Sequence, residues 1–176
     1  IADAASITGT PTFDFTAATL PAGLVWDTSS FATNGQIKIN NLYGTWAAGT
    51  FANAFTQTLP GQDQDSDNYV NLMEYAFGTD PTVNSSGQIT YASGVVSAHG
   101  QPVLVQNSGN YFAVFGRRTD YVAAGLTYTV EFSPDMSTWA ASATTPTTLA
   151  TDGVIDAVSV PYPTSLIATP SGPKKA

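Results

Sequence analysis

Residues 63–74 read Asp63-Gln-Asp-Ser-Asp-Asn-Tyr-Val-Asn-Leu-Met-Glu74, and they carry oxygen ligands at the spacing of a calcium loop. Calcium takes six to eight oxygen ligands at about 2.3–2.6 Å, and a twelve-residue loop supplies them from positions 1, 3, 5, 7, 9 and 12. The backbone carbonyl is the ligand at position 7, and a two-oxygen carboxylate is the ligand at position 12. The spacing predicts a Ca²⁺ site formed by Asp63, Asp65, Asp67, the carbonyl of Tyr69, Asn71 and Glu74.

Asn68 stands where such loops have glycine, because the chain must turn there with positive φ. Asn is the next most tolerant residue for that conformation. The alternative is an acidic surface loop whose three aspartates are merely solvated. Without a metal, however, three carboxylates within five residues repel one another, so the alternation favours calcium.

The residues around the loop predict helices. Residues 70–77 form a helix-compatible run that stops at Gly78, and Asp80 and Pro81 then turn the chain away. Upstream, residues 45–55 predict a short helix that Thr45 caps, with Trp46, Phe51 and Phe55 partly buried.

The segment 63–81 closely resembles the calcium repeats of dockerins and thrombospondin type 3 modules, in which an acidic loop leads into an Asn-Leu-x-Glu-Tyr-Ala-x-Gly-Thr-Asp-Pro run. The matching residues are Asn71, Leu72, Glu74, Tyr75, Ala76, Gly78, Thr79, Asp80 and Pro81. The resemblance implies calcium binding and no catalytic activity.

Composition narrows the partners of the chain. The 176 residues contain no cysteine, so thiolate metal sites are excluded. Their formal net charge is −8, so nucleic acid and anionic lipid are poor partners. No apolar run approaches the ~20 residues that span a bilayer, so no membrane insertion is expected. A weak calcium site suits the millimolar calcium outside cells, which favours a secreted, extracellular or cell-surface protein.

Outside the calcium segment, short alternating strands separated by turn residues dominate the chain. In residues 126–132, for example, Leu126, Tyr128, Val130 and Phe132 share one face of a predicted half-buried strand. The other predicted strands are 12–16, 24–26, 36–40 (with Ile37 and Ile39 inward), 89–91, 95–96, 103–105, 111–115 and 154–160. These strands predict a mainly β fold, an antiparallel β-sandwich (jelly-roll or immunoglobulin-like) with a small helix-loop-helix calcium insert.

This reading divides the chain into four parts. They are N-terminal strands over 1–42 that contribute to the sandwich or to a neighbouring subunit, the calcium insert over 43–82, a C-terminal β module over 83–168, and a tail over 169–176. Trp139 is expected to fold back onto the core. The run from Leu126 to Trp139, together with residues 115–118, resembles a C-terminal module of large secreted bacterial surface proteins that carry autotransporter-type β-strand repeats. Residues 20–30 resemble the stretch that closes the preceding repeat domain in such proteins.

Catalysis finds little support in the sequence. His99, the only histidine, is expected to be a solvated or turn-capping loop residue. No Gly-x-Ser-x-Gly elbow occurs, and the carboxylates outside the loop are scattered. Arg117 and Arg118 could bind an anionic ligand, or sugar hydroxyls beside Tyr121. We expect instead that one of them pairs with a strand or calcium-loop carboxylate and stacks on an aromatic ring. A carbohydrate platform would draw on Trp26, Trp46, Trp139, Tyr43, Tyr111 and Tyr121, each of which sits in a context that more often means core.

The expected function is therefore that of a non-catalytic, calcium-stabilised structural subunit. Only a tenth of the residues are charged, so edge strands have few charges to prevent pairing between copies. We expect self-assembly into a surface layer or filament as a homo-oligomer or polymer, with residues 1–15 adding as a strand to a neighbouring copy. The alternative is a carbohydrate-binding or adhesive module that takes a polysaccharide as its partner.

Overall fold

The computed structural model describes residues 9, 11–52, 55–84 and 87–163, and it is mainly β with antiparallel pairing. Three helices and ten strands are formed by the described residues. In chain order they are β1 (Leu24–Asp27), α1 (Phe31–Asn34), β2 (Lys38–Asn41), α2 (Leu42–Phe51), α3 (Asn71–Phe77), β3 (Thr90–Ala92), β4 (Val95–Ala98), β5 (Val103–Asn107), β6 (Asn110–Arg118), β7 (Glu131–Phe132), β8 (Ala140–Ala141), β9 (Thr147–Thr151) and β10 (Ile155–Pro161).

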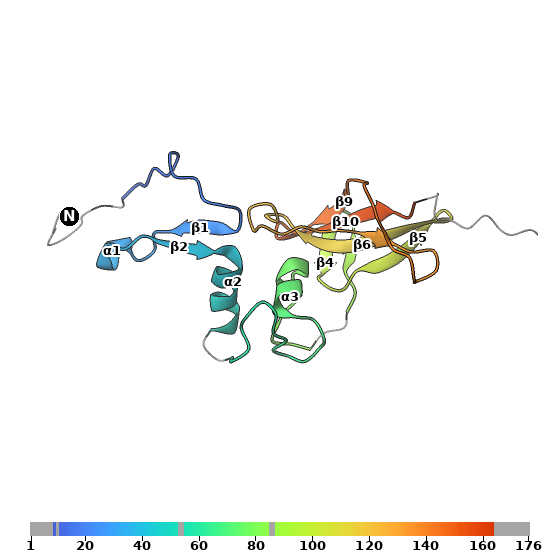
Figure 1. Cartoon of the computed structure of the whole chain (residues 1–176), viewed down its shortest axis with the longest axis horizontal. Coiled ribbons are helices and arrows are strands. Elements are labelled where there is room, and N and C mark those ends of the chain that lie inside the picture. Colours follow the sequence, from blue (N-terminus) through green and yellow to red (C-terminus); the bar gives the residue numbers. More distant parts are fainter. Residues whose placement is uncertain (1–8, 10, 53–54, 85–86, 164–176) are drawn as a thin grey trace, which may run out of the picture.

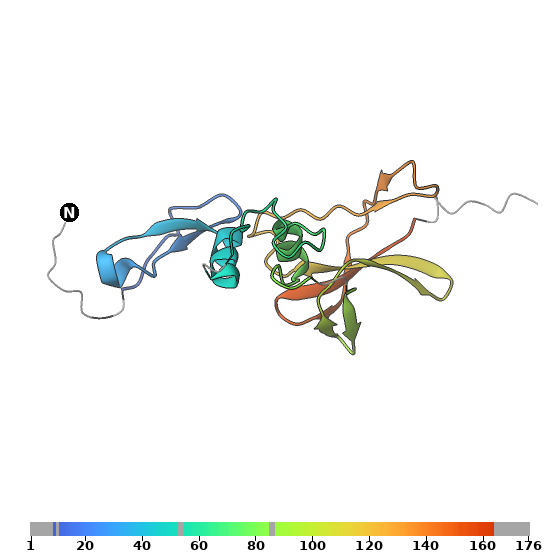
Figure 2. The ribbon, with the colours of Figure 1, turned by 90° about the horizontal axis from the view of Figure 1, so that it is seen from below.

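The molecule is elongated (Figures 1 and 2). The β1–β2 hairpin with α1 lies towards one end, the larger sheet lies towards the other, and α2 and α3 stand between them. The turn before β1 also contacts the segment that follows β6, because Gly23 N donates a hydrogen bond to Ala123 O. Gly23 has φ +86°, and a Cβ there would lie 3.1 Å from Ala124 O, so this backbone approach requires glycine.

The larger sheet has the order β5-β6-β10-β9, and each face carries an apolar cluster. Alternation along β6 sends Val114 to one face and Phe115 to the other. Val114 packs with Ile89 and Val96 from the β3–β4 region, which covers the first face. Phe115 packs with Phe132, Val158 and Val160, and Phe77, Tyr128 and Val130 cover this second face.

The segment 126–132 is extended, and its alternation is as predicted. Leu126, Tyr128 and Val130 are half-buried and Phe132 is buried, whereas the residues between them are exposed. Only Glu131–Phe132 joins a ladder, by pairing with β8. The prediction of one continuous strand over 126–132 is therefore wrong for residues 126–130, although the predicted inward face is confirmed.

Two expectations for the N-terminal part are also wrong. Residues 12–16 form no strand, and the rings of Phe13 and Phe15 instead stack at 5.7 Å, with Phe15 lying 4.8 Å from the Trp26 ring. Ile37 and Ile39 are 40% and 50% exposed rather than inward. The physical reason is that the β1–β2 hairpin is a two-stranded sheet with no second layer over these isoleucines in the described residues.

The helix before the loop begins earlier than predicted. α2 starts after Asn41, whose side chain accepts a hydrogen bond from Gly44 N, so Asn41 rather than Thr45 is the cap. Thr45 lies inside the helix and donates its hydroxyl to Asn41 O at 3.1 Å. Phe51 is buried, and Trp46 and Phe55 are half-buried, as expected.

The remaining expectations have mixed outcomes. Strands 24–26, 89–91, 95–96, 103–105, 111–115 and 154–160 are each found as β1, β3, β4, β5, β6 and β10, within one to three residues at most ends. Trp139 is 52% exposed, so the expectation that it folds onto the core is wrong. Most of the expected donor segment (1–8 and 10) and the tail 169–176 lie outside the described residues. Within the described ranges, no helix has the length and apolar character needed to cross a membrane.

Candidate metal centre

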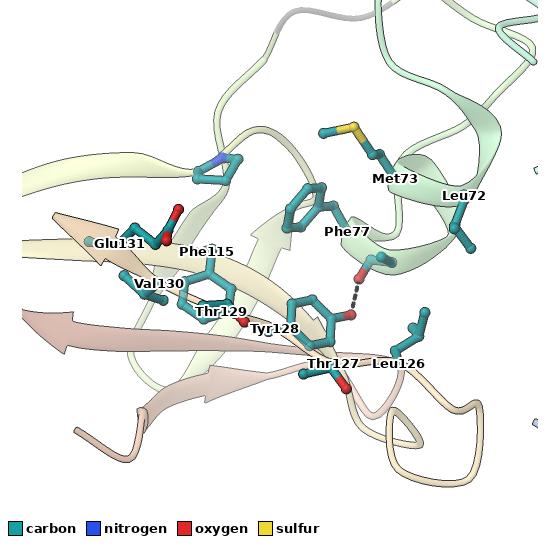
Figure 3. A pocket seen from close by; sticks show the side chains of 13 residues that line it. Leu72, Met73, Phe77, Phe115, Leu126, Thr127, Tyr128, Thr129, Val130 and Glu131 are labelled. Atoms are coloured by element: carbon teal, nitrogen blue, oxygen red, sulfur yellow. Dashed lines mark hydrogen bonds between the residues drawn. The ribbon is translucent and has the colours of Figure 1, made fainter. Parts of the chain in front are cut away.

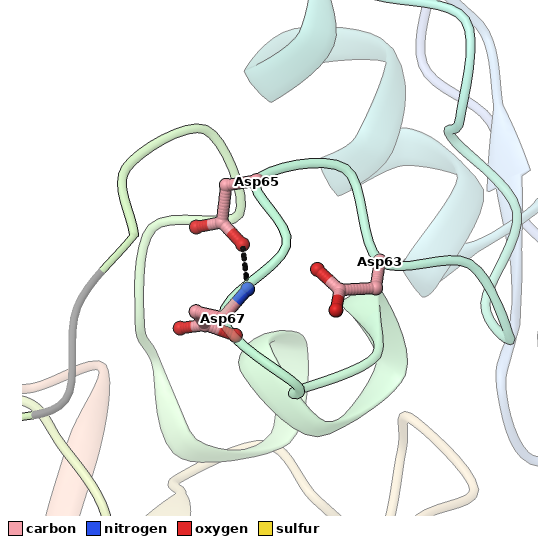
Figure 4. Close-up of side chains that lie close together, drawn as sticks. All are labelled: Asp63, Asp65 and Asp67. Atoms are coloured by element: carbon pink, nitrogen blue, oxygen red, sulfur yellow. Dashed lines mark hydrogen bonds between the residues drawn. The ribbon is translucent and has the colours of Figure 1, made fainter.

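The three loop aspartates come together in space. One carboxylate oxygen from each of Asp63, Asp65 and Asp67 lies within 4.8 Å of the other two. Figure 4 shows the three side chains within one tight turn of the backbone ahead of α3. The alternate spacing in the sequence therefore does place these carboxylates around a common point.

Backbone amides hold the carboxylates in this arrangement. Asp63 accepts hydrogen bonds from Ser66 N at 2.7 Å and from Asn68 N at 3.0 Å, and Asp67 accepts one from Tyr69 N at 2.8 Å. The loop closes because Ser66 and Asn68 have positive φ, 63° and 75°. The positive φ predicted for Asn68 is confirmed.

Glu74 belongs to the first turn of α3, which brings its carboxyl group beside the loop. Glu74 is 0% exposed, and its Oε2 is a buried oxygen that accepts no hydrogen bond within the described part of the chain. Burial and the neighbouring Asp65 and Asp67 raise the pKa of Glu74 to about 8. Glu74 is not within the 4.8 Å spacing that defines the aspartate cluster, yet its charge is coupled to all three aspartates.

Asp65, like Glu74, has a buried carboxylate oxygen and a raised pKa. Its Oδ2 is buried without a hydrogen-bond partner among the described residues, and desolvation together with Asp67 raises its pKa. Buried oxygens that lack partners are uncommon in folded proteins, and coordination of a cation is one physical role for such oxygens. Two members of the predicted ligand set thus present unsatisfied acceptors.

Asn71 has a structural role that the sequence did not reveal. Its Nδ2 donates to Gln57 O at 2.8 Å and to Leu59 O at 3.0 Å, which ties the start of α3 to the segment after α2. Its Oδ1 is buried and accepts no hydrogen bond within the described ranges. Asn71 is therefore an anchor of the loop that retains an available oxygen.

The two arginines form their ion pairs with carboxylates outside the loop. The three ion pairs found among the described residues join His99 to Asp152, Arg117 to Asp156 and Arg118 to Asp120. The arginines also lie over rings, with the guanidinium carbon 4.7 Å from the Tyr121 centroid for Arg117 and 4.2 Å from the Tyr75 centroid for Arg118. The expectation that one arginine pairs with a carboxylate and stacks on an aromatic ring is therefore met by both, and the paired carboxylates, Asp156 and Asp120, lie outside the calcium loop.

These donors fit a hard divalent cation. The candidate ligands are oxygens alone, from carboxylates, an amide and a backbone carbonyl, and the chain has no cysteine. Calcium prefers such ligands, whereas zinc and copper favour imidazole and thiolate. A calcium ion would occupy a site where three or four acidic groups otherwise repel one another.

The helix that bears Glu74 is fixed to the larger sheet by several contacts. Tyr128 donates its hydroxyl to Ala76 O at 2.6 Å, and Phe77 packs in the Phe115 cluster. Gly78 ends α3 with φ +79°, as predicted, and its carbonyl lies 2.6 Å from His99 Nδ1. The opposite ring nitrogen of His99 lies 2.6 Å from Asp152 Oδ2.

His99 was expected to be a solvated or turn-capping loop residue. It instead connects the end of α3 to the β9–β10 turn, and no sequence pattern signalled this connection. Since both ring nitrogens face oxygen acceptors, both hydrogen bonds together require two N–H groups.

Most of the aromatic residues considered for a carbohydrate platform are engaged internally. Trp26 stacks on Phe15, and Tyr43 and Trp46 pack against Tyr75. Trp139 and Tyr111 are 52% and 44% exposed and lie on different elements.

Comparisons with known proteins identify no relative of this chain. When the chain is compared with protein families, with curated proteins and with solved structures, nothing matches it.

Proposed function

We propose that the chain is a non-catalytic, calcium-stabilised structural module of a secreted protein. The observation that carries this proposal is the buried carboxyl group of Glu74, which lies beside three clustered aspartates and has an oxygen without a hydrogen-bond partner in the described part of the chain. A buried charge without compensation destabilises a fold strongly, so a bound cation would stabilise the ionised form of this arrangement.

Asp63, Asp65, Asp67, Glu74 and the Tyr69 carbonyl would hold the ion, with Asn71 as the sixth candidate ligand. Bound calcium supplies positive charge that offsets the repulsion among these carboxylates. The protein's own residues convert this local effect into rigidity. Glu74 lies on α3, Asn71 ties α3 to the segment after α2, and Tyr128 and Phe77 tie it to the sheet.

The finer architecture that we propose is an incomplete sandwich. The second face of the larger sheet is covered by the extended segment 126–132 and by Phe77 of α3, so a one-strand layer faces a four-stranded one. The division into an N-terminal hairpin, a calcium insert and a β module belongs to the same proposal.

We further propose that the module self-assembles at a cell surface through β-strand addition. Strand β5, at one edge of the larger sheet, has the sequence Val103-Leu-Val-Gln-Asn107 and carries no charge. Natural edge strands are commonly protected by charged side chains, so this composition permits association between copies.

The experiment that tests the calcium role is thermal unfolding with excess EGTA and with millimolar Ca²⁺. At a free calcium concentration a hundredfold above the dissociation constant, the proposal expects about 2.7 kcal/mol of added stability. Equal melting temperatures in the two conditions would contradict it. Negative-stain microscopy and sedimentation of the same samples test self-assembly.

The second candidate function is a carbohydrate-binding module. It is favoured by the exposure of Trp139 and Tyr111. Retention on polysaccharide gels that is lost on substituting Trp139 by alanine would support this candidate over assembly.

A further inference from the structure

The segment 127–131 presents an unpaired backbone edge. Ser142 N donates to Val130 O at 2.8 Å, so the peptide groups of Val130 face β8. Successive residues of an extended chain direct their N–H and C=O groups to opposite sides. Thr127, Thr129 and Glu131 therefore direct theirs away from β8, where no described strand pairs with them.

An apolar groove lies beside this edge. It has a volume of about 490 Å³ and runs between α3 and the segment 126–131. Figure 3 shows Leu72, Met73 and Phe77 of α3 on one side and the labelled residues 126–131 along the other. Glu131 is the one charged residue that lines the groove in the described part of the chain.

A strand of suitable chemistry lies in the N-terminal hairpin. Leu42 N donates to Gly23 O, so by alternation the peptide groups of residues 38 and 40 face β1 and those of Ile37 and Ile39 face outward. The same two isoleucines are 40% and 50% exposed. The outer edge of β2 thus combines unpaired peptide groups with uncovered apolar side chains.

Charge also matches between the two segments. Lys38 lies between the isoleucines. Of the lysines and arginines among the described residues, Lys38 alone forms no salt bridge. Glu131 is exposed and likewise has no salt bridge to a described residue. Lys38, whose cross-strand neighbour in its own hairpin is Asp27, therefore lies in the middle of one candidate edge, and Glu131 lies at the end of the other.

We propose that β2 of a second copy of this chain adds to the edge 127–131, with Ile37 and Ile39 towards the groove. The register requires parallel pairing. The outward-facing peptide groups belong to 37 and 39 on one strand and to 127, 129 and 131 on the other. Antiparallel pairing would align 37 and 39 with the solvent-facing residues, whereas parallel pairing places Lys38 beside Glu131 and Ile37 beside Val130.

The inference rests on the proposed self-assembly and names its contact. Because β2 and the acceptor edge lie in different parts of the elongated molecule, the contact is head-to-tail and builds open chains of copies. It also replaces the expected donor, since Phe13 and Phe15 pack onto the chain's own Trp26 region.

Cross-linking tests the register without background, because the chain has no cysteine. Gln36→Cys and Thr129→Cys proteins, mixed under mild oxidation, are expected to form a disulfide-linked pair, since residue 36 aligns with residue 129 when 38 aligns with 131. Ile39→Cys mixed with Thr129→Cys is the matched control, because residue 39 aligns with residue 129 only in the antiparallel register. A cross-link in the control and none in the test pair would overturn the parallel arrangement.

Charge reversal tests the interface independently of cysteine. Lys38→Glu and Glu131→Lys are each expected to lower the association constant about tenfold, through like charges on adjacent strands, and the double variant is expected to restore it. Sedimentation of the full chain with calcium measures the association. Assembly that is indifferent to both reversals, with no cross-link at 36 and 129, would refute this contact and leave self-assembly standing, whereas a wild-type chain that stays monomeric at all concentrations would refute both.

Discussion

Replacing Glu74 by glutamine should stabilise the protein in EGTA and abolish its response to calcium. The Glu74 carboxyl group is 0% exposed and has a pKa raised from 4.5 to about 8. A raised carboxyl pKa means that the folded state binds the extra proton, so stability of the metal-free protein falls as pH rises from about 4.5 to 8.

The size of the effect follows from the same values. A pH of 7 is some 2.5 units above the pKa of 4.5 in the unfolded chain and still below the pKa of about 8 in the folded protein. The metal-free protein is therefore about 3 kcal/mol less stable at pH 7 than below pH 4.5. Glutamine has the same shape, keeps an Oε1 for the 3.4 Å contact from Thr79 Oγ1 and carries no charge. The variant should therefore unfold at a higher urea concentration than the wild type in EGTA.

Calcium should raise the free energy of unfolding of the wild type and leave that of the Glu74→Gln variant unchanged. The wild type gains stability from the ion, whereas the variant lacks the carboxylate that would hold it. Urea unfolding followed by tryptophan fluorescence, at low protein concentration with EGTA or millimolar Ca²⁺, gives the four free energies of unfolding. Glu131→Gln is the matched control, because Glu131 is the chain's other glutamate and is exposed. The reasoning is refuted if Glu74→Gln is less stable than the wild type in EGTA while the wild type ignores calcium.

Three further predictions follow from the site. Calcium affinity should rise about tenfold per pH unit below pH 8, because binding displaces one proton from Glu74, and calorimetry in buffers of different ionisation enthalpy should detect that proton; a pH-independent affinity between pH 6 and 8 would contradict this. Gly78→Ala should lower the free energy of unfolding in urea by at least ~1–3 kcal/mol, because Gly78 has φ +79° and a Cβ would lie 2.5 Å from Ile155 Cγ1 and 2.9 Å from His99 Nδ1. An unchanged urea midpoint would show that α3 does not pack as described. Asn68→Gly should retain calcium binding and Asn68→Val should weaken it, because φ at this position is 75° and valine tolerates positive φ poorly; equal calorimetric affinities for the two variants would count against the loop geometry.

The parts of the fold that the sequence predicted well are those with a strong local signal. Alternation of charge and turn residues located the acidic loop, the positive φ of Asn68 and the end of α3 at Gly78. Period-two alternation also predicted the inward face of residues 126–132, because burial against the sheet decides which side chains turn inward.

The parts that the sequence could not predict depend on tertiary neighbours. Alternation in 36–40 is the same whether or not a second layer covers Ile37 and Ile39, so their exposure could not be read from the pattern. The bridge from His99 to Gly78 and Asp152 joins residues that are 21 and 53 positions apart. The link from Asn71 to Gln57 and Leu59 likewise depends on the path of the chain after α2.

Direct titration of the purified chain with calcium tests the central claim most directly. Isothermal calorimetry at pH 8 should show one saturable site per chain for the wild type, and an Asp65→Asn, Asp67→Asn double variant should lose it. The absence of any saturable binding up to millimolar calcium, or binding that persists unchanged in the double variant, would contradict the account.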